Sequence, residues 1–135
     1  GLFLSDIQSA NSYYLLQQYN IKHIINLSTF KTHKFDGIEY LTINIDDHPS
    51  EDILQYFDQT NRFIGSALAK KQNVLVHCVA GISRSPTIVA AYMINRFKIN
   101  AADAISLTKN RRSIVNPNEG FKNQLAQYAS NNRNH

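Results

Sequence analysis

The chain has 135 residues, of which 43% are hydrophobic and 18% charged, and its formal net charge is +4. This length and composition are ordinary for one globular domain with its own hydrophobic core, so we expect a single domain over residues 1–135. No apolar run is long enough to span a bilayer, and the first residues lack the layout of a signal peptide. The sequence therefore predicts a soluble domain and excludes a membrane-spanning one.

The charged residues indicate which kinds of partner to expect, and the cysteine content indicates the compartment. Lysines and arginines are scattered, and only Lys70-Lys71 and Arg111-Arg112 are adjacent. This mild positive charge favours anionic ligands in general, and without a basic stripe we expect neither nucleic acid nor a membrane as partner. The single cysteine precludes an internal disulfide and fits a reducing compartment, so an intracellular location, cytoplasmic or nuclear, is expected. The sequence carries no indication of oligomeric state.

Taken in chain order, the sequence predicts strands that alternate with helices. Four short apolar or alternating segments predict strands: residues 2–4, 23–27, 39–45 and 74–76. Helical spacing predicts a helix capped by Ser9 or Asn11, one from Ser50 to about Lys71, one over 84–96, one from Asn100 to about Asn110, and one from 117–120 through Tyr128. Residues 130–135 are polar and are expected to fray.

This alternation implies an α/β domain. We expect a central, mostly parallel, twisted sheet of about four or five strands flanked by helices. In such a sheet the ligand belongs at the carboxyl ends of the strands. Cys78 and the pair Asp46-Asp47 both lie just past predicted strand ends, so both lie where a ligand is expected.

The segment that follows the strand at 74–76 carries the clearest chemistry. His77-Cys78 leads into a short loop with Gly81, and Arg84-Ser85-Pro86 then opens a helix. The first turn of a helix has free N–H groups and a positive dipole end, and a glycine-containing loop adds further N–H groups, which makes an anion site. Arg84 offers a planar fork for two phosphate oxygens. A thiol in this field ionises easily, so Cys78 is a candidate nucleophile aimed at phosphorus.

The alternative for Cys78 is an inert, buried small side chain, which is the usual role of a lone cysteine after a strand. The complete pattern H-C-x-x-G-x-x-R-S argues against that role. With average residue usage, its other four residues coincide with a cysteine on the order of once per 10^5 cysteines.

Residues 77–85 resemble the signature of the cysteine-dependent protein tyrosine phosphatases, specifically the dual-specificity phosphatases, and the likeness extends from residue 2 to Phe121. The resemblance implies a phosphate-binding loop between a strand and a helix, with no metal or cofactor. It implies catalytic roles for Cys78 and Arg84, release of the cysteine sulfur assisted by Ser85, and supporting roles for His77 behind the loop and for Asn118 bracing it. It implies a phosphate-binding segment made of Val79, Ala80, Gly81, Ile82, Ser83 and Arg84.

The acidic segment 46–52 supplies a candidate general acid. For an arbitrary protein its aspartates would be turn or capping residues, whereas a phosphate-cleaving site needs an acid to protonate the leaving oxygen. By resemblance to the family, Asp47 takes that role, and Asp46 is the alternative.

The resemblance implies phosphoproteins as substrates, with phosphotyrosine and phosphoserine or phosphothreonine both accepted. The alternatives within the superfamily are a phosphoinositide, glycan or RNA phosphatase. Lipid-directed relatives often carry lysines in the loop, whereas Val79, Ala80, Ile82 and Ser83 are uncharged. A further alternative is a non-catalytic phosphoprotein-binding module, but such proteins are expected to have lost the nucleophile, which is retained here as Cys78.

Overall fold

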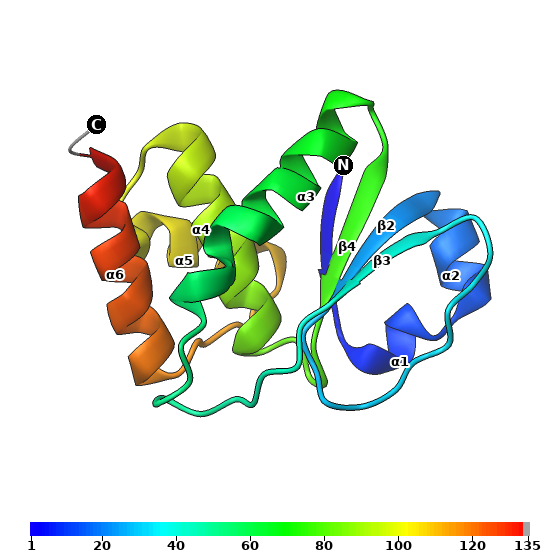
Figure 1. Cartoon of the computed structure of the whole chain (residues 1–135), viewed down its shortest axis with the longest axis horizontal. Helices are drawn as coiled ribbons and strands as arrows, with labels where there is room; N and C mark the ends of the chain where they lie inside the picture. Colours follow the sequence, from blue (N-terminus) through cyan, green and yellow to red (C-terminus); the bar gives the residue numbers. More distant parts are fainter. Residues whose placement is uncertain (134–135) are drawn as a thin grey trace.

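A four-stranded parallel sheet lies at the centre of the computed structural model, which describes residues 1–133 (Figure 1). The strands are β1 (Leu2–Ser5), β2 (Ile21–Asn26), β3 (Glu39–Thr42) and β4 (Asn73–His77). Their order in the sheet is β1-β4-β2-β3, and every pair is parallel. The carboxyl ends of all four strands therefore meet at one edge, as expected for an α/β domain.

Helices cover both faces of the sheet. The short helices α1 (Ile7–Ala10) and α2 (Tyr13–Gln18) lie on one face (Figure 1). The other side holds the 3-10 turn η1 (Leu54–Tyr56) and the helices α3 (Phe57–Ala69), α4 (Arg84–Phe97), α5 (Ala101–Arg111) and α6 (Glu119–Arg133). Helices α3 and α4 contact β4 directly, and α5 and α6 pack against α4. No helix in residues 1–133 combines the length and apolar character needed to cross a membrane.

Two unequal hydrophobic cores result, one on each face. Because successive side chains of a strand point to opposite faces, Ile25 and Val76 join the large core under α3 and α4, whereas Ile24 and Leu75 join the small core under α1 and α2. Burial of both faces explains why β2 and β4 appear in the sequence as continuous apolar runs. The predicted fold class, a mostly parallel sheet of four or five strands flanked by helices, is confirmed.

Three predicted helix boundaries are wrong. The first predicted helix is two helices, capped by Asp6 and Ser12, whose side chains accept from the N–H groups of Ser9 and Leu15 at 2.8 and 3.3 Å. Ser50 caps no helix, because its hydroxyl pairs with His48 Nδ1 at 2.7 Å and α3 begins later. The last helix continues to Arg133, so residues 130–133 are not frayed, and residues 134 and 135 lie outside the described residues.

The predicted strand at 39–45 is shorter in the sheet, where β3 ends at Thr42. Ile43 and Ile45 are nevertheless buried in the large core. The alternation of polar and apolar residues over 39–45 therefore correctly indicated which side chains are buried, although the last three residues form no strand. The segment that follows carries Asp46 and Asp47 to the carboxyl edge of the sheet.

Candidate active site

Cys78 is the first residue after β4, and its side chain is only 2% exposed. Two polar groups converge on its sulfur. The N–H of Gly81 donates to Sγ at 3.3 Å, and the hydroxyl of Ser85, in the first turn of α4, lies 3.1 Å from it. Both groups stabilise a negative sulfur, which is the reactive form of cysteine.

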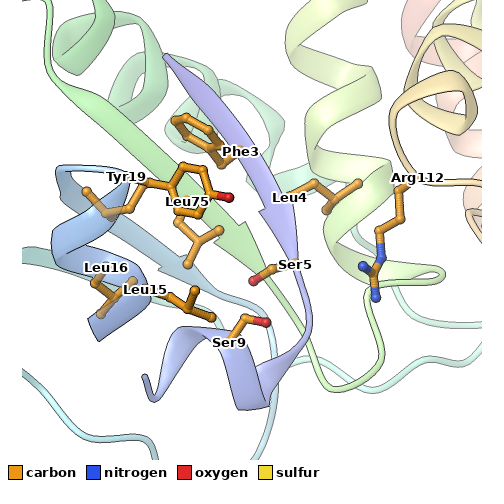
Figure 2. Close-up of a pocket in the computed structure, with 10 residues that line it drawn as sticks. Phe3, Leu4, Ser5, Ser9, Leu15, Leu16, Tyr19, Leu75 and Arg112 are labelled. Atoms are coloured by element: carbon orange, nitrogen blue, oxygen red, sulfur yellow. The ribbon is translucent and has the colours of Figure 1, made fainter. Parts of the chain in front are cut away.

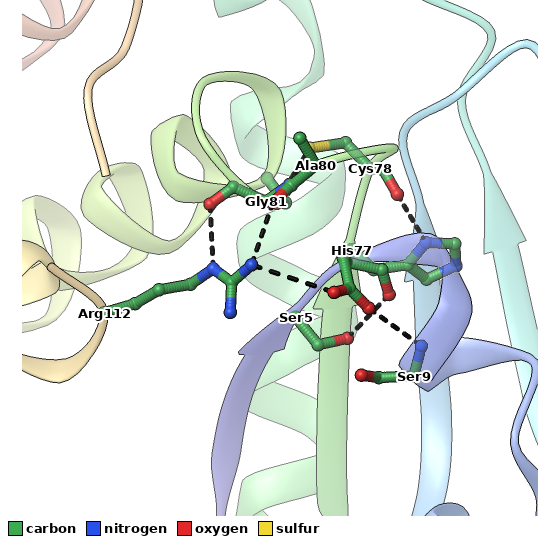
Figure 3. A network of polar contacts seen from close by, with 9 residues as sticks. Ser5, Ser9, His77, Cys78, Ala80, Gly81 and Arg112 are labelled. Carbon is green, nitrogen blue, oxygen red and sulfur yellow. Dashed lines mark hydrogen bonds and ion pairs between the residues drawn. The ribbon is translucent and has the colours of Figure 1, made fainter. Parts of the chain in front are cut away.

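The loop after Cys78 has its carbonyl groups bonded to the surrounding protein. The carbonyl oxygens of Val79, Ile82 and Ser83 accept from the N–H groups of Ile7, Asn116 and Thr87 at 2.9, 2.8 and 3.1 Å. Ala80 and Gly81 bond instead to the Arg112 side chain (Figure 3).

The N–H groups of this loop are left free for a ligand. Within residues 1–133, those of Val79, Ala80, Ile82 and Ser83 donate no hydrogen bond to the protein. In a trans peptide the N–H points opposite to the carbonyl, so fixing the carbonyls outward turns the N–H groups inward. The loop is therefore a preformed anion nest at the N-terminus of α4.

Arg84 opens α4 and reaches the segment before the aspartates. Its Nη1 donates to the Ile45 carbonyl at 2.8 Å. Its Nε is buried and has no hydrogen-bond partner among the described residues. A buried N–H donor without a partner is costly unless an anion completes it, which supports a phosphate-binding role for this side chain.

Asn118 joins the loop to the acidic segment. Its main-chain N–H donates to Ser83 Oγ at 2.9 Å, and its Nδ2 donates to Asp47 Oδ1 at 2.9 Å. The sequence-based expectation that the Asn118 side chain braces the loop is therefore corrected: the main chain contacts the loop, and the side chain holds Asp47. Asp46 has no side-chain hydrogen bond within residues 1–133.

His77 is the last residue of β4 and directly precedes the nucleophile. It is 1% exposed, and its Nδ1 donates to the Cys78 carbonyl at 3.1 Å. Burial lowers the pKa of His77 below its ordinary value of 6.5, despite the opposing effects of this hydrogen bond and of Asp6. The ring is therefore neutral at physiological pH and fixes the main chain at the start of the loop.

Sequence reasoning missed Arg112 and Asp6. Arg112 follows α5, more than thirty residues after the loop it contacts, and Asp6 follows β1. The only sequence signal was the adjacent pair Arg111-Arg112, which carries no information about distance to Cys78. Among the described residues no group of His, Cys, Asp and Glu side chains is arranged to hold a metal ion.

A cavity of about 360 Å³ borders β1 and is distinct from the phosphate loop. Its lining is largely apolar, and neither Cys78 nor Asp47 contributes to it. Figure 2 shows Leu16 and Tyr19 on one side of β1 and Arg112 on the other. The cavity thus follows the edge strand β1, and two of its lining residues, Ser5 and Arg112, lie next to Gly81 at the back of the loop.

The site thus brings together a buried thiol after a parallel strand, a nest of free N–H groups, an arginine with an unused donor and a carboxyl held by Asn118. These are the groups that the resemblance to the cysteine-dependent phosphatases predicts for one site. The chain belongs to the family described as "Dual specificity phosphatase, catalytic domain", whose pattern it matches over residues 2–131.

The similar proteins support this family and differ in what they are named to do. "Dual specificity protein phosphatase 22" of Xenopus laevis is 35% identical over 95% of this chain and 61% of its own length, so the chain spans about three fifths of that relative. The crystal structure of DUSP15 has a TM-score of 0.93 and 35% identity, covering 96% of this chain and 83% of that one. A human "tyrosine phosphatase-like serine/threonine/tyrosine-interacting protein" has a TM-score of 0.90 and 37% identity, covering 96% and 91%.

Proposed function

We propose that this chain hydrolyses phosphate monoesters on phosphoproteins, at phosphotyrosine and at phosphoserine or phosphothreonine, through a cysteinyl-phosphate on Cys78. The observation that carries the proposal is the Cys78 sulfur held at the base of a nest of free N–H groups. A thiol nucleophile needs a reducing compartment, so we place the activity in the cytoplasm or the nucleus.

In the first step the Cys78 thiolate attacks phosphorus in line with the leaving oxygen. The S–P bond forms as the P–O bond to the substrate side chain breaks, and Asp47 donates its proton to the departing oxygen. The charge on the three equatorial oxygens is stabilised by the loop N–H groups and by the free donors of Arg84. Asp47 suits the acid role better than Asp46, because the Asn118 amide holds it toward the loop.

In the second step water attacks the cysteinyl-phosphate. Asp47, now ionised, accepts a proton from that water, a P–O bond forms, and the S–P bond breaks to return the thiolate. The Ser85 hydroxyl, 3.1 Å from Sγ, donates to the departing sulfur. One carboxyl group therefore serves as acid and then as base.

Kinetics on matched peptides carrying phosphotyrosine, phosphoserine or phosphothreonine test the proposal, with phosphoinositides as a parallel panel. We expect turnover of the peptides by the wild type and none by Cys78→Ser. Exclusive turnover of lipid would contradict the protein-substrate assignment, and wild-type activity in Cys78→Ser would contradict the nucleophile.

A non-catalytic role is the second candidate, because one similar structure is named as phosphatase-like and interacting. It predicts phosphopeptide binding by the wild type without turnover. Retention of Cys78, Arg84 and Asp47 in one site favours catalysis.

A further inference from the structure

Arg112 contacts the back of the phosphate loop from outside the signature. It directly follows α5, and its guanidinium spans two consecutive carbonyl groups: Nη2 donates to Ala80 at 2.9 Å and Nε donates to Gly81 at 3.1 Å (Figure 3). Bonds from a cation are stronger than those between neutral groups, and the planar fork of arginine fixes both at once. The middle of the loop is thus held by one side chain.

The contact to Ala80 leads directly to the nucleophile. The carbonyl that accepts from Arg112 belongs to the Ala80–Gly81 peptide, and the N–H of the same peptide donates to Cys78 Sγ at 3.3 Å. Because one rigid, planar group carries both bonds, the guanidinium sets the direction of the N–H. It also polarises the peptide, which strengthens the bond to sulfur.

Gly81 supplies independent evidence for this close fit. Its φ is +71°, in the left-handed region, and a Cβ built there would lie 2.8 Å from the Ser5 carbonyl oxygen and 2.9 Å from Arg112 Nε. A side chain would therefore occupy the space that the guanidinium and β1 use. The loop conformation and the Arg112 contact depend on the same missing side chain.

Asp6 lies beside the guanidinium. Its Oδ2 is 4.0 Å from Arg112 Nη2, and its Oδ1 accepts from the Ser9 N–H at 2.8 Å. The hydrogen bond from Ser9, together with the Arg112 charge, holds the pKa of Asp6 below its ordinary value, so the carboxylate is charged at neutral pH. The two side chains are 27% and 34% exposed, and ion pairs of this kind contribute little. The bonds to the loop carbonyls therefore dominate.

We propose that Arg112, assisted by Asp6, is a positioning residue that holds the phosphate loop in its anion-binding form and keeps the Gly81 N–H on the Cys78 sulfur. The inference rests on the proposed function for its catalytic consequence only, because anion binding and thiol reactivity are measurable without turnover.

The test compares Arg112→Ala and Arg112→Lys with Arg111→Ala, a matched control one residue earlier that is exposed and makes no hydrogen bond to the loop. Three assays are run: the rate of Cys78 alkylation by iodoacetamide at pH 6, the affinity for inorganic phosphate, and steady-state kinetics (kcat and KM) on a phosphopeptide. Since Cys78 is the only cysteine in the chain, the mass of the alkylated protein reports on that thiol alone.

For Arg112→Ala we expect phosphate affinity and kcat/KM to fall by roughly 10- to 100-fold, as for a misplaced set of oxyanion donors. Alkylation should slow in parallel, because fewer thiolates form when the Gly81 N–H no longer points at sulfur. Arg112→Lys should lose less than Arg112→Ala in all three measurements, because its ammonium group can still bond one of the two carbonyls. Asp6→Asn should show the smallest loss of phosphate affinity and kcat/KM, because asparagine still caps α1.

A purely structural role would change the melting temperature and leave alkylation and phosphate affinity as in the wild type, and that result would overturn the proposal. An equal loss of phosphate affinity and alkylation rate in Arg111→Ala would overturn it as well. If Arg112→Ala does not fold, Arg112→Lys decides in the same way. A wild type that binds phosphate but turns over no phosphopeptide would contradict the proposed function alone.

Discussion

Asp46 and Asp47 are adjacent and both exposed, yet only Asp47 is hydrogen-bonded to the site, through the Asn118 amide at 2.9 Å. The sequence named both as candidates, because a strand end followed by two aspartates does not say which one turns toward the loop. The hydrogen bond to Asn118 gives that direction. The assignment of the general acid therefore depends on a contact between residues more than seventy positions apart.

We expect Asp47→Asn to lower kcat on phosphoserine peptides by about 100-fold or more, the usual contribution of a general acid. The loss should be smaller with an aryl phosphate, whose leaving group needs less protonation. Asp46→Asn is the matched control and should retain most activity. Steady-state kinetics on both substrates check this, and a larger loss in Asp46→Asn would reverse the assignment.

His77 gives a pH dependence of stability. Burial lowers its pKa below 6.5 in the folded chain, whereas the unfolded chain titrates near the ordinary value of about 6.5. Below that pH the unfolded state binds more protons than the folded state. This contribution to the free energy of unfolding is therefore fully present above the unfolded pKa and is lost as the pH falls toward the folded pKa.

Urea unfolding at pH 7.5, 6.5 and 5.5 measures this effect. The slope contributed by His77 is at most about 1.4 kcal/mol per pH unit. His77→Asn, which keeps a donor near Nδ1, should flatten the decline, and the exposed His33→Asn should leave it unchanged. An identical slope in the wild type and His77→Asn would contradict the prediction.

At the scale of elements, strands were predicted better than helix starts. The strands β2 and β4 are buried on both faces, and apolar, β-branched runs signal that directly. Helix starts depend on which of several nearby polar residues reaches a free N–H, and the segment 5–12 offers Ser5, Asp6, Ser9, Asn11 and Ser12. The nucleophile loop was predictable because its chemistry is local. The Arg112 contact was not, because it depends on the path of the chain through α4 and α5.

Gly120, in the first turn of α6, sets how closely this helix approaches the acidic segment. A Cβ at this position would run into the Pro49 carbonyl, so the two segments pack backbone to backbone. Asp47 and Asn118 each lie two residues from this contact. The close approach at Gly120 therefore keeps the acid next to the residue that holds it.

Gly120→Ala should therefore move the acidic segment away from Asn118 and lower kcat on phosphoserine peptides by roughly tenfold, the effect of a displaced catalytic group. Affinity for inorganic phosphate should change little, because the loop N–H groups are not displaced. Gly65→Ala is the control, since a Cβ there meets nothing within 4 Å, and alanine should stabilise α3 by about 0.5–1 kcal/mol. Unchanged kcat in a folded Gly120→Ala would contradict this account.

Across the whole molecule, the parallel sheet is what assembles the site. Asp6 follows β1, Asp47 lies five residues beyond β3, and Cys78 follows β4, so the common direction of the strands gathers them at one edge. This arrangement was predictable from the alternation of strands and helices. The distances at that edge were not, because they depend on how α5 and α6 return to it.

Because the anion nest is preformed, a bound oxyanion should stabilise the whole fold. A ligand that binds only the folded state adds RT ln(1 + [L]/Kd), about 2.7 kcal/mol at a hundredfold excess over Kd. We therefore expect inorganic phosphate to raise Tm in the wild type and in Cys78→Ser, where the loop N–H groups remain. Arg84→Ala should lose most of this Tm shift, since the buried Nε of Arg84 has no other partner among the described residues.

Arg62 is exposed and serves as the control, so Arg62→Ala should keep the full Tm shift. Thermal melts across a phosphate series measure this, and equal shifts in Arg84→Ala and Arg62→Ala would mean that phosphate acts through general surface charge and not through the nest.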